Sequence, residues 1–268
     1  MKRLIGLLLA VVCWQGAYAS TFPNVSITKH LAESQVNLKS MVQADGMIPE
    51  DSLQILYRVI GLDTYGLSYN VFRYGMIGFC ALREEGKLNQ RNILTVIDFT
   101  KSSRKKRFFT IDLDSMRVLF NTYVSHGKNT GEDMATNFSN IVHSNQSSIG
   151  FYVTGETYVG SKGYSLRLDG VEEKFNANLR TRAVVVHGAD YVSEQWINKY
   201  GRLGRSQGCP ALPSHLSKEV IDVIKDRTAI FAYYNDNAYL QSSSYLNFHR
   251  LVASTDEEET GNSSERNY

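Results

Sequence analysis

The hydrophobic pattern of the chain changes near residue 90, and the part before it reads as helical from about residue 20. Apolar residues recur there at helical spacing, and a helix start is predicted at Ile48-Pro49-Glu50-Asp51. Proline fits the first turn of a helix, and acidic residues interact favourably with its positive end. A second helix is predicted after Ser68. The apolar positions that form the first stripe are Leu53, Leu56, Val59 and Ile60.

After residue 91, short β-rich runs separated by turn residues replace the helical pattern. The predicted strands are 93–99, 107–113, 117–124, 148–155, 164–168 and 182–187, with a last strand at 228–234. Because Asp114-Ser115 makes a tight connection, the first three are expected to form an antiparallel meander. A short helix is predicted at 217–225. These elements predict a mainly β (α+β) fold, an antiparallel β-sandwich or barrel-like domain preceded by a helical segment.

The two ends of the chain differ from this pattern. Lys2 and Arg3 precede an apolar run, and Ala17-Tyr18-Ala19 has the small-x-small arrangement of a signal-peptidase site. The run is shorter than the roughly 18 to 20 residues that a membrane span needs, and no later segment qualifies. We therefore expect an exported protein of the periplasm or cell envelope. A lipid-modified Cys13 is disfavoured, because Val12 before it is not small.

These features divide the chain into four predicted parts. They are a signal peptide at 1–19, a helical segment at 20–90, a catalytic domain at 91–235 and a C-terminal extension at 236–268. The acidic, polar residues from about 254 onward carry too little apolar surface to order themselves.

Composition narrows the function classes. The formal net charge of +2 gives no reason to expect a nucleic-acid partner, and 43% hydrophobic residues suffice for a core. One basic cluster, residues 101–107, is interpreted as a solvated hairpin loop rather than an anion-binding patch. No CxxC, HExxH or comparable spacing indicates a metal site.

Two cysteines remain after the predicted leader is removed. Cys80 lies in an apolar, helical-looking segment and is interpreted as a small core residue. Cys209 lies between Gly208 and Pro210, in backbone that suits a side chain displayed on a loop. From this segment alone a structural cysteine and a nucleophile fit equally well. The pair could also form one disulfide or remain as two free thiols.

A nucleophilic cysteine needs a nearby base or positive charge, because an ordinary thiol is mostly protonated at neutral pH. His187 has the strongest position, since it ends the apolar run 183–186 and Gly188 leaves space beside it. His126 and His143 in Gly-rich or polar loops are the alternatives. A structural role for His187 also remains open at this point. The other histidines are assigned to the surface or to a helix cap.

A family resemblance runs through the same residues. His187-Gly188 followed by Ser206-Gln207-Gly208-Cys209 resembles the His-Gly and Ser/Thr-x-Gly-Cys signature of the L,D-transpeptidase (YkuD-like) catalytic domain, in its murein branch. The resemblance covers roughly residues 90 to 235, with Gln207 where many members carry histidine. Further matching segments are Asp98-Phe99, Ser125-His126-Gly127, Phe138-Ser139-Asn140, 146–152, 155–158, 166–170, 187–191 and 201–210.

The resemblance implies a mechanism without metal or organic cofactor. Cys209 would attack the amide between diaminopimelate and D-alanine in a peptidoglycan stem peptide, and His187, oriented by the Gly188 carbonyl, would transfer the proton. Amides around Gly208 and Cys209 are the expected oxyanion donors, in a loop that also contains Ser206. Arg205 is the candidate for holding a substrate carboxylate, with a solvated loop arginine as the alternative.

The acyl acceptor defines the alternative functions. A second stem peptide would give a 3→3 crosslink, water would make the protein an L,D-carboxypeptidase, and a lipoprotein amine is a third acceptor. A different cell-wall thiol peptidase also fits the cysteine. In a non-catalytic wall-binding domain, Cys209 would pair with Cys80. Nothing in the sequence predicts the oligomeric state.

Overall fold

The computed structural model describes residues 49–247. The predicted signal peptide at 1–19, residues 20–48 of the predicted helical segment and the polar stretch from about 254 lie outside the described residues. Within the described part, no helix is long and apolar enough to cross a membrane.

Two helices open the described chain, as the apolar stripes predict. Helix α3 (Glu50–Ile60) begins directly after Pro49, and Gly61 ends it in the left-handed conformation with φ of 71°. Helix α4 (Tyr69–Glu84) follows Ser68, whose Oγ accepts a hydrogen bond of 3.4 Å from the backbone N–H of Val71. Both predicted helices are therefore confirmed.

Eight strands form one mixed sheet in the order β3-β2-β1-β8-β4-β5-β6-β7. The β1–β8 and β6–β7 pairs are parallel and the other pairs are antiparallel, so the predicted meander is confirmed in β1–β2–β3. The short strand β7 and the helices α5 and α7 were not predicted. The strands are β1 (Ile93–Asp98), β2 (Phe108–Asp112), β3 (Arg117–Thr122), β4 (Gly150–Gly160), β5 (Gly163–Gly170), β6 (Val185–Ala189), β7 (Ala211–Pro213) and β8 (Ala229–Tyr233). The remaining helices are α5 (Glu194–Tyr200), α6 (Ser214–Ile224) and α7 (Asn237–Ser242).

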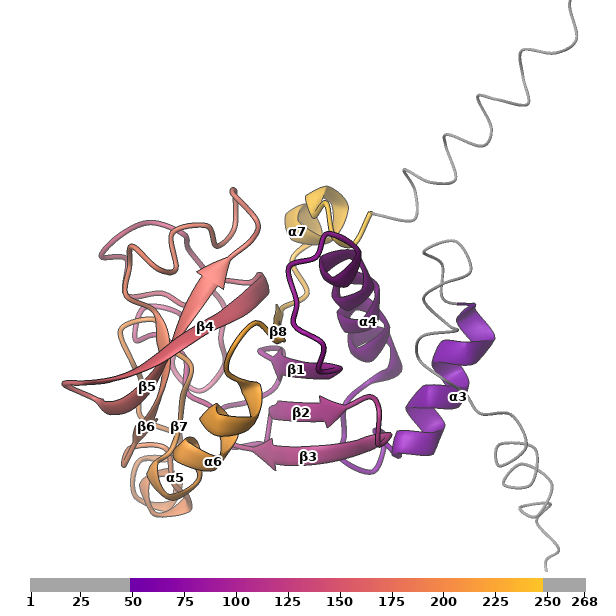
Figure 1. Ribbon diagram of the computed structural model, residues 1–268. Coiled ribbons are helices and arrows are strands. Elements are labelled where there is room, and N and C mark those ends of the chain that lie inside the picture. The colour runs from indigo at the N-terminus through magenta and orange to yellow at the C-terminus, as the bar shows by residue number, and fades with distance from the viewer. Residues whose placement is uncertain (1–48, 248–268) are drawn as a thin grey trace, which may run out of the picture. The chain divides into compact units, whose positions relative to one another are not determined.

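The central strands are buried on both faces. In β1, Leu94 and Val96 belong to one hydrophobic core, whereas Ile93 and Ile97 belong to another. Residues of α3, α4 and α7 complete the first core, and residues of β5, β6, β7 and α6 complete the second (Figure 1). The sheet therefore curls into a nearly closed sandwich or barrel, which confirms the predicted fold class.

Helix α4 packs directly on the sheet. A Cβ added to Gly78 would lie 2.0 Å from the Phe151 ring, so only glycine allows this close approach. Cys80, on the same helix, is 3% exposed and free, and burial raises the pKa of its thiol to about 12. Its predicted role as a small core residue is confirmed, and the alternative with a Cys80–Cys209 disulfide is wrong.

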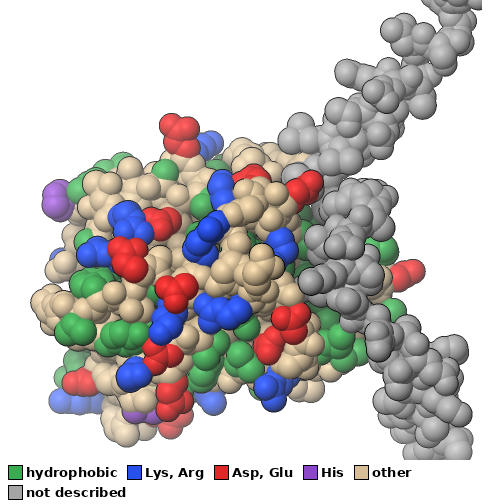
Figure 2. All heavy atoms as spheres, viewed as in Figure 1, with side chains coloured by type: hydrophobic (Ala, Val, Ile, Leu, Met, Phe, Trp, Pro, Cys, Tyr) green, Lys and Arg blue, Asp and Glu red, His purple; other side chains and the backbone are tan. Residues whose placement is uncertain are grey.

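The basic cluster at 101–107 forms the β1–β2 hairpin loop, but only part of it is solvated. Arg104, Lys105 and Lys106 are exposed, whereas Arg107 is fully buried. The Arg107 guanidinium donates to the carbonyls of Val124 and Lys101, which satisfies it inside the protein. The predicted solvated loop is thus wrong for Arg107. Elsewhere, positive and negative side chains lie interspersed over the face that Figure 2 shows.

Candidate active site

The parallel β6–β7 pair brings the Cys209 loop next to the strand that carries His187. His187 is paired with Ala211, and the same register continued by two residues places Cys209 opposite Val185. The backbone N–H of Val185 lies 3.5 Å from the Cys209 Sγ. The thiol therefore lies beside Val185 of β6. His187 is two residues further along that strand, which corresponds to about 7 Å.

His187 is held in one tautomer. Its side chain is buried, and Nδ1 lies 2.8 Å from the carbonyl oxygen of Gly188. Because a carbonyl oxygen only accepts, Nδ1 carries the proton and Nε2 is left able to accept one. Burial also lowers the pKa of His187, which keeps the ring neutral near pH 7. This is the state that a general base requires. Between residues 49 and 247, neither ring nitrogen makes a hydrogen bond to Cys209.

The Cys209 thiol has opposing neighbours. Its sulfur lies 3.8 Å from the carbonyl oxygen of Ala183, which favours the protonated thiol, and accepts from the Val185 N–H, which favours the thiolate. Burial raises the pKa of the Cys209 thiol, while the Val185 N–H and the cations Arg182 and Lys162 oppose that rise. Since the rise prevails, reaction at neutral pH needs a proton acceptor.

Ser206 fixes the turn that leads to the thiol. Its Oγ donates to the carbonyl oxygen of Cys209 at 2.7 Å and accepts from the Gly208 N–H at 3.1 Å. Its backbone N–H donates to the His126 carbonyl at 2.9 Å. Because the Gly208 amide is already engaged, the Cys209 amide is the better of the two predicted oxyanion donors. Among residues 49–247 the Cys209 N–H has no hydrogen-bond acceptor.

Gly208 lies where the loop crosses another segment of chain. Its φ of +123° disfavours any residue with a side chain, and an added Cβ would lie 2.8 Å from the carbonyl oxygen of Gln146. The Ser147 Oγ donates to the Gly208 carbonyl oxygen at 3.1 Å. Glycine at this position therefore lets the nucleophile loop rest on the 146–147 backbone.

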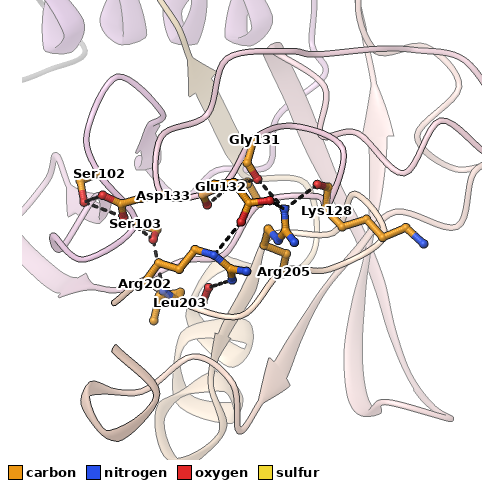
Figure 3. A network of polar contacts seen from close by, with 10 residues as sticks. Ser102, Ser103, Lys128, Gly131, Glu132, Asp133, Arg202, Leu203 and Arg205 are labelled. Atoms are coloured by element: carbon orange, nitrogen blue, oxygen red, sulfur yellow. Dashed lines mark hydrogen bonds and ion pairs between the residues drawn. The ribbon is translucent and has the colours of Figure 1, made fainter. Parts of the chain in front are cut away.

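Arg205 lies in the ion-pair network of Figure 3. Its Nη1 is 2.6 Å from the Glu132 carboxylate and donates to the carbonyls of Lys128 and Gly131. Arg202 reaches the second oxygen of Glu132 at 2.9 Å. Through Nη1, Arg205 therefore anchors the 128–132 loop, and its role in binding a substrate carboxylate stays a prediction.

His126, the strongest alternative base, has no free ring nitrogen. Nδ1 lies 2.7 Å from Nη2 of Arg107, and Nε2 lies 3.2 and 3.1 Å from the carbonyl oxygens of Gly131 and Glu132. The ring is 1% exposed, and burial together with the Arg107 charge lowers the pKa of His126 to about 4. This histidine is a structural link between two loops. His143, the other alternative, is exposed.

Three charged or titratable groups near Cys209 were not singled out from the sequence. Arg182 precedes β6, Lys162 lies at the β4–β5 turn, and Tyr191 follows β6. Burial and the neighbouring Cys209 raise the pKa of the Tyr191 phenol to about 12, so it is neutral. Only Arg182 had a signal in the sequence, because it begins the predicted strand 182–187 that carries the candidate base. No group of His, Cys, Asp and Glu in the described chain could hold a metal ion.

Comparison with known proteins defines the class to which this fold and site belong. The sequence model of the L,D-transpeptidase catalytic domain matches residues 63–233, which is more than half of the chain. The protein therefore belongs to the L,D-transpeptidase catalytic domain family. No curated protein matches the chain.

Several solved structures are similar to this chain at low identity. An L,D-transpeptidase from Mycobacterium smegmatis is 14% identical, with a TM-score of 0.34 over 54% of this chain and 59% of that one. L,D-transpeptidase 1 of Mycobacterium tuberculosis is 14% identical, with a TM-score of 0.30 over 54% and 62%. An enzyme from Stackebrandtia nassauensis is 13% identical, with a TM-score of 0.32 over 79% and 90%. The chain thus spans about 60% of the mycobacterial chains.

Proposed function

We propose that the protein is a peptidoglycan L,D-transpeptidase in which Cys209 is the nucleophile and His187 the general base. The observation that carries the proposal is the arrangement along β6. The His187 Nδ1 bonds the Gly188 carbonyl, and the Val185 N–H contacts the Cys209 sulfur two residues away on the same strand. The family membership supports the reaction class.

Acylation begins with transfer of the thiol proton to Nε2 of His187. The Cys209 sulfur attacks the carbonyl carbon of the amide between diaminopimelate and D-alanine, and the Cys209 N–H donates to the developing oxyanion. When the C–N bond breaks, His187 returns the proton to the leaving amine and D-alanine departs. The product is a thioester on Cys209.

Deacylation sets the final product. The side-chain amine of a second stem peptide attacks the thioester, His187 takes its proton, and the thiolate leaves, which gives a 3→3 crosslink. Water in place of the amine releases the tripeptide, the outcome for an L,D-carboxypeptidase, and a lipoprotein amine gives an attached protein. The predicted leader and this substrate support a bacterial envelope as the proposed site of action.

Product analysis tests the proposal. The protein is incubated with a disaccharide-tetrapeptide, with and without an acceptor stem, and the products are identified by mass spectrometry. We expect release of D-alanine and, with acceptor, a crosslinked dimer. Cys209→Ala should abolish both, whereas Cys80→Ala, a change at the buried thiol, should preserve them. Release of a different fragment would instead indicate another thiol peptidase.

Covalent trapping gives a second test of the nucleophile. A carbapenem, a β-lactam with which the resembling family reacts, should add one molecule to the protein at Cys209. The adduct should be absent from Cys209→Ala. A covalent adduct that persists on Cys209→Ala would refute the assignment.

A further inference from the structure

Arg182 is a half-buried cation with no ion-pair partner in the described part of the chain. Its guanidinium is held by four neutral oxygens, and no carboxylate lies within ion-pair distance. Nη1 donates to the Ser139 carbonyl at 2.6 Å and to the Ser148 Oγ at 2.7 Å. Nη2 donates to the Ser144 Oγ at 3.1 Å and to the Gln146 carbonyl.

Arg180, two residues earlier, is different. It is exposed and bonded to the carboxylates of Glu156 and Asp169. The two arginines thus differ in electrostatic role although they share one short segment. The charge of Arg180 is neutralised by its neighbours, whereas the neutral acceptors around Arg182 orient its charge without cancelling it.

The uncompensated charge lies beside the nucleophile. Nη2 of Arg182 would lie 3.3 Å from a Cβ added to Gly208, the residue before Cys209. The carbonyl of Ala183, the next residue after Arg182, lies 3.8 Å from the Cys209 sulfur. Glycine at position 208 therefore leaves the space that the guanidinium occupies.

We propose that Arg182 supplies the fixed positive charge that stabilises the Cys209 thiolate, and that Gly208 permits its approach. The inference rests on the proposed function only in naming Cys209 as the nucleophile. Arg182 acts as a positioning residue, because its donors are engaged with the chain rather than free for substrate. It also ties the 139–148 segment, on which the Cys209 loop rests, to the start of β6.

Four charged or titratable groups lie near the thiol, and two of them, Arg182 and Lys162, lower its pKa. The four are Arg182 before β6, Lys162 on the β4–β5 turn, His187 on β6 and Tyr191 after it. Arg182 is held rigidly by four hydrogen bonds, whereas no hydrogen bond to Lys162 occurs among residues 49–247. A fixed charge acts on the thiol at all times, so we expect Arg182 to outweigh Lys162.

The test measures how the rate of Cys209 alkylation by iodoacetamide depends on pH, with modification of the Cys209 peptide followed by mass spectrometry. Arg182→Gln should raise the pKa of the Cys209 thiol by about one pH unit, the size of effect that a neighbouring opposite charge has. Near pH 7 alkylation should slow about tenfold. Arg182→Lys, which keeps the charge, should retain most of the reactivity.

Arg180→Gln is the matched control. It removes an arginine from the same segment and should leave the thiol pKa unchanged. A purely structural role for Arg182 predicts a lower melting temperature for Arg182→Gln with the thiol pKa of the wild type, and this result would overturn the inference. An equal effect of Arg180→Gln would overturn it as well. If Arg182→Gln does not fold, Arg182→Lys decides, because a raised thiol pKa in that folded variant contradicts a role of the charge.

The assay is independent of the proposed reaction. Iodoacetamide reports thiolate formation without any peptidoglycan fragment. A wild-type protein that releases no D-alanine but shows the Arg182-dependent thiol pKa would refute the proposed function and retain this inference. A wild-type protein that releases D-alanine but whose thiol pKa does not depend on Arg182 would refute only the inference about Arg182.

Discussion

The buried, neutral His126 should make the stability of the fold depend on pH between about pH 6.5 and 4. The pKa of its ring is lowered to about 4 in the folded protein, from an ordinary value near 6.5. The unfolded chain therefore binds this proton more tightly. The contribution of His126 to stability is complete above pH 6.5 and is lost as the pH falls through the interval.

The magnitude follows from the two pKa values. Linkage gives a loss of about 2 kcal/mol in the free energy of unfolding between about pH 7 and pH 5, and about 3 kcal/mol below pH 4. The physical causes are burial of the ring and the Arg107 guanidinium 2.7 Å from Nδ1, since a protonated ring would bring two buried cations together. Carboxylates such as Glu156 and Asp222, whose pKa values are lowered, lose their contributions only at lower pH.

Urea unfolding at several pH values measures this effect. His126→Gln cannot titrate in this range, yet its amide can accept from Arg107 and donate to the Gly131 carbonyl. The variant should therefore lose about 2 kcal/mol less than the wild type between about pH 7 and pH 5. His215→Gln, on the exposed face of α6, should follow the wild type. Parallel losses in the wild type and His126→Gln would refute the reasoning. The lowered pKa of the buried His187 acts in the same interval in all three proteins and cancels in the comparison.

Three further predictions concern the site and the packing beneath it. His187→Ala should reduce D-alanine release by about a hundredfold or more, the range for a lost general base, as measured by mass spectrometry. Gly78→Ala should destabilise the protein by about 1 to 3 kcal/mol in urea unfolding, because its Cβ meets the Phe151 ring at 2.0 Å, whereas Gly75→Ala, whose Cβ has only ordinary contacts of 3.4 to 3.5 Å, should be neutral or stabilising. Arg205→Gln should lower the melting temperature and leave KM for the tetrapeptide unchanged; a raised KM with an unchanged melting temperature would instead support its predicted role in substrate binding.

Local patterns in the sequence predicted most strands and both early helices. The hydrophobic runs of β1, β2 and β3 are local signals, and so is the capping residue Ser68. Each concerns only residues that are close in the sequence, so it can be recognised without knowledge of the fold. Strand β7 lacked such a signal. It has three residues, ends at a proline and exists because it pairs with β6, a contact that the sequence does not show.

The residues of the candidate site likewise fall into those that the sequence identified and those whose role it did not show. Cys209 and His187 could be selected because a glycine stands beside each of them in the sequence, although Gly208 is buried and Gly188 lies within β6. The roles of Arg205 and Arg182 could not be assigned from the sequence. The role of an arginine depends on which groups accept its hydrogen bonds, and for these two the acceptors lie far away in the chain. Glu132 holds Arg205 across 73 positions, and Ser139 accepts from Arg182 across 43. The predicted assignment of a carboxylate-binding role to Arg205 lacked this information.

The parallel pairing of β6 with β7 explains why nucleophile and base come from separate segments. A parallel pair needs a long connection, and residues 190–210 supply it with α5 and the Cys209 loop. Both segments run in the same direction, so Cys209 and His187 lie in register with a fixed offset: Val185 opposite Cys209, His187 opposite Ala211. The offset sets the thiol two residues from the imidazole along β6, so the two groups lie on the same face of the strand. Under the proposed mechanism, shifting this register by one residue would turn one of the two side chains to the opposite face of the sheet and disable the site, and it would move Val186 or Leu212 out of the second core as well.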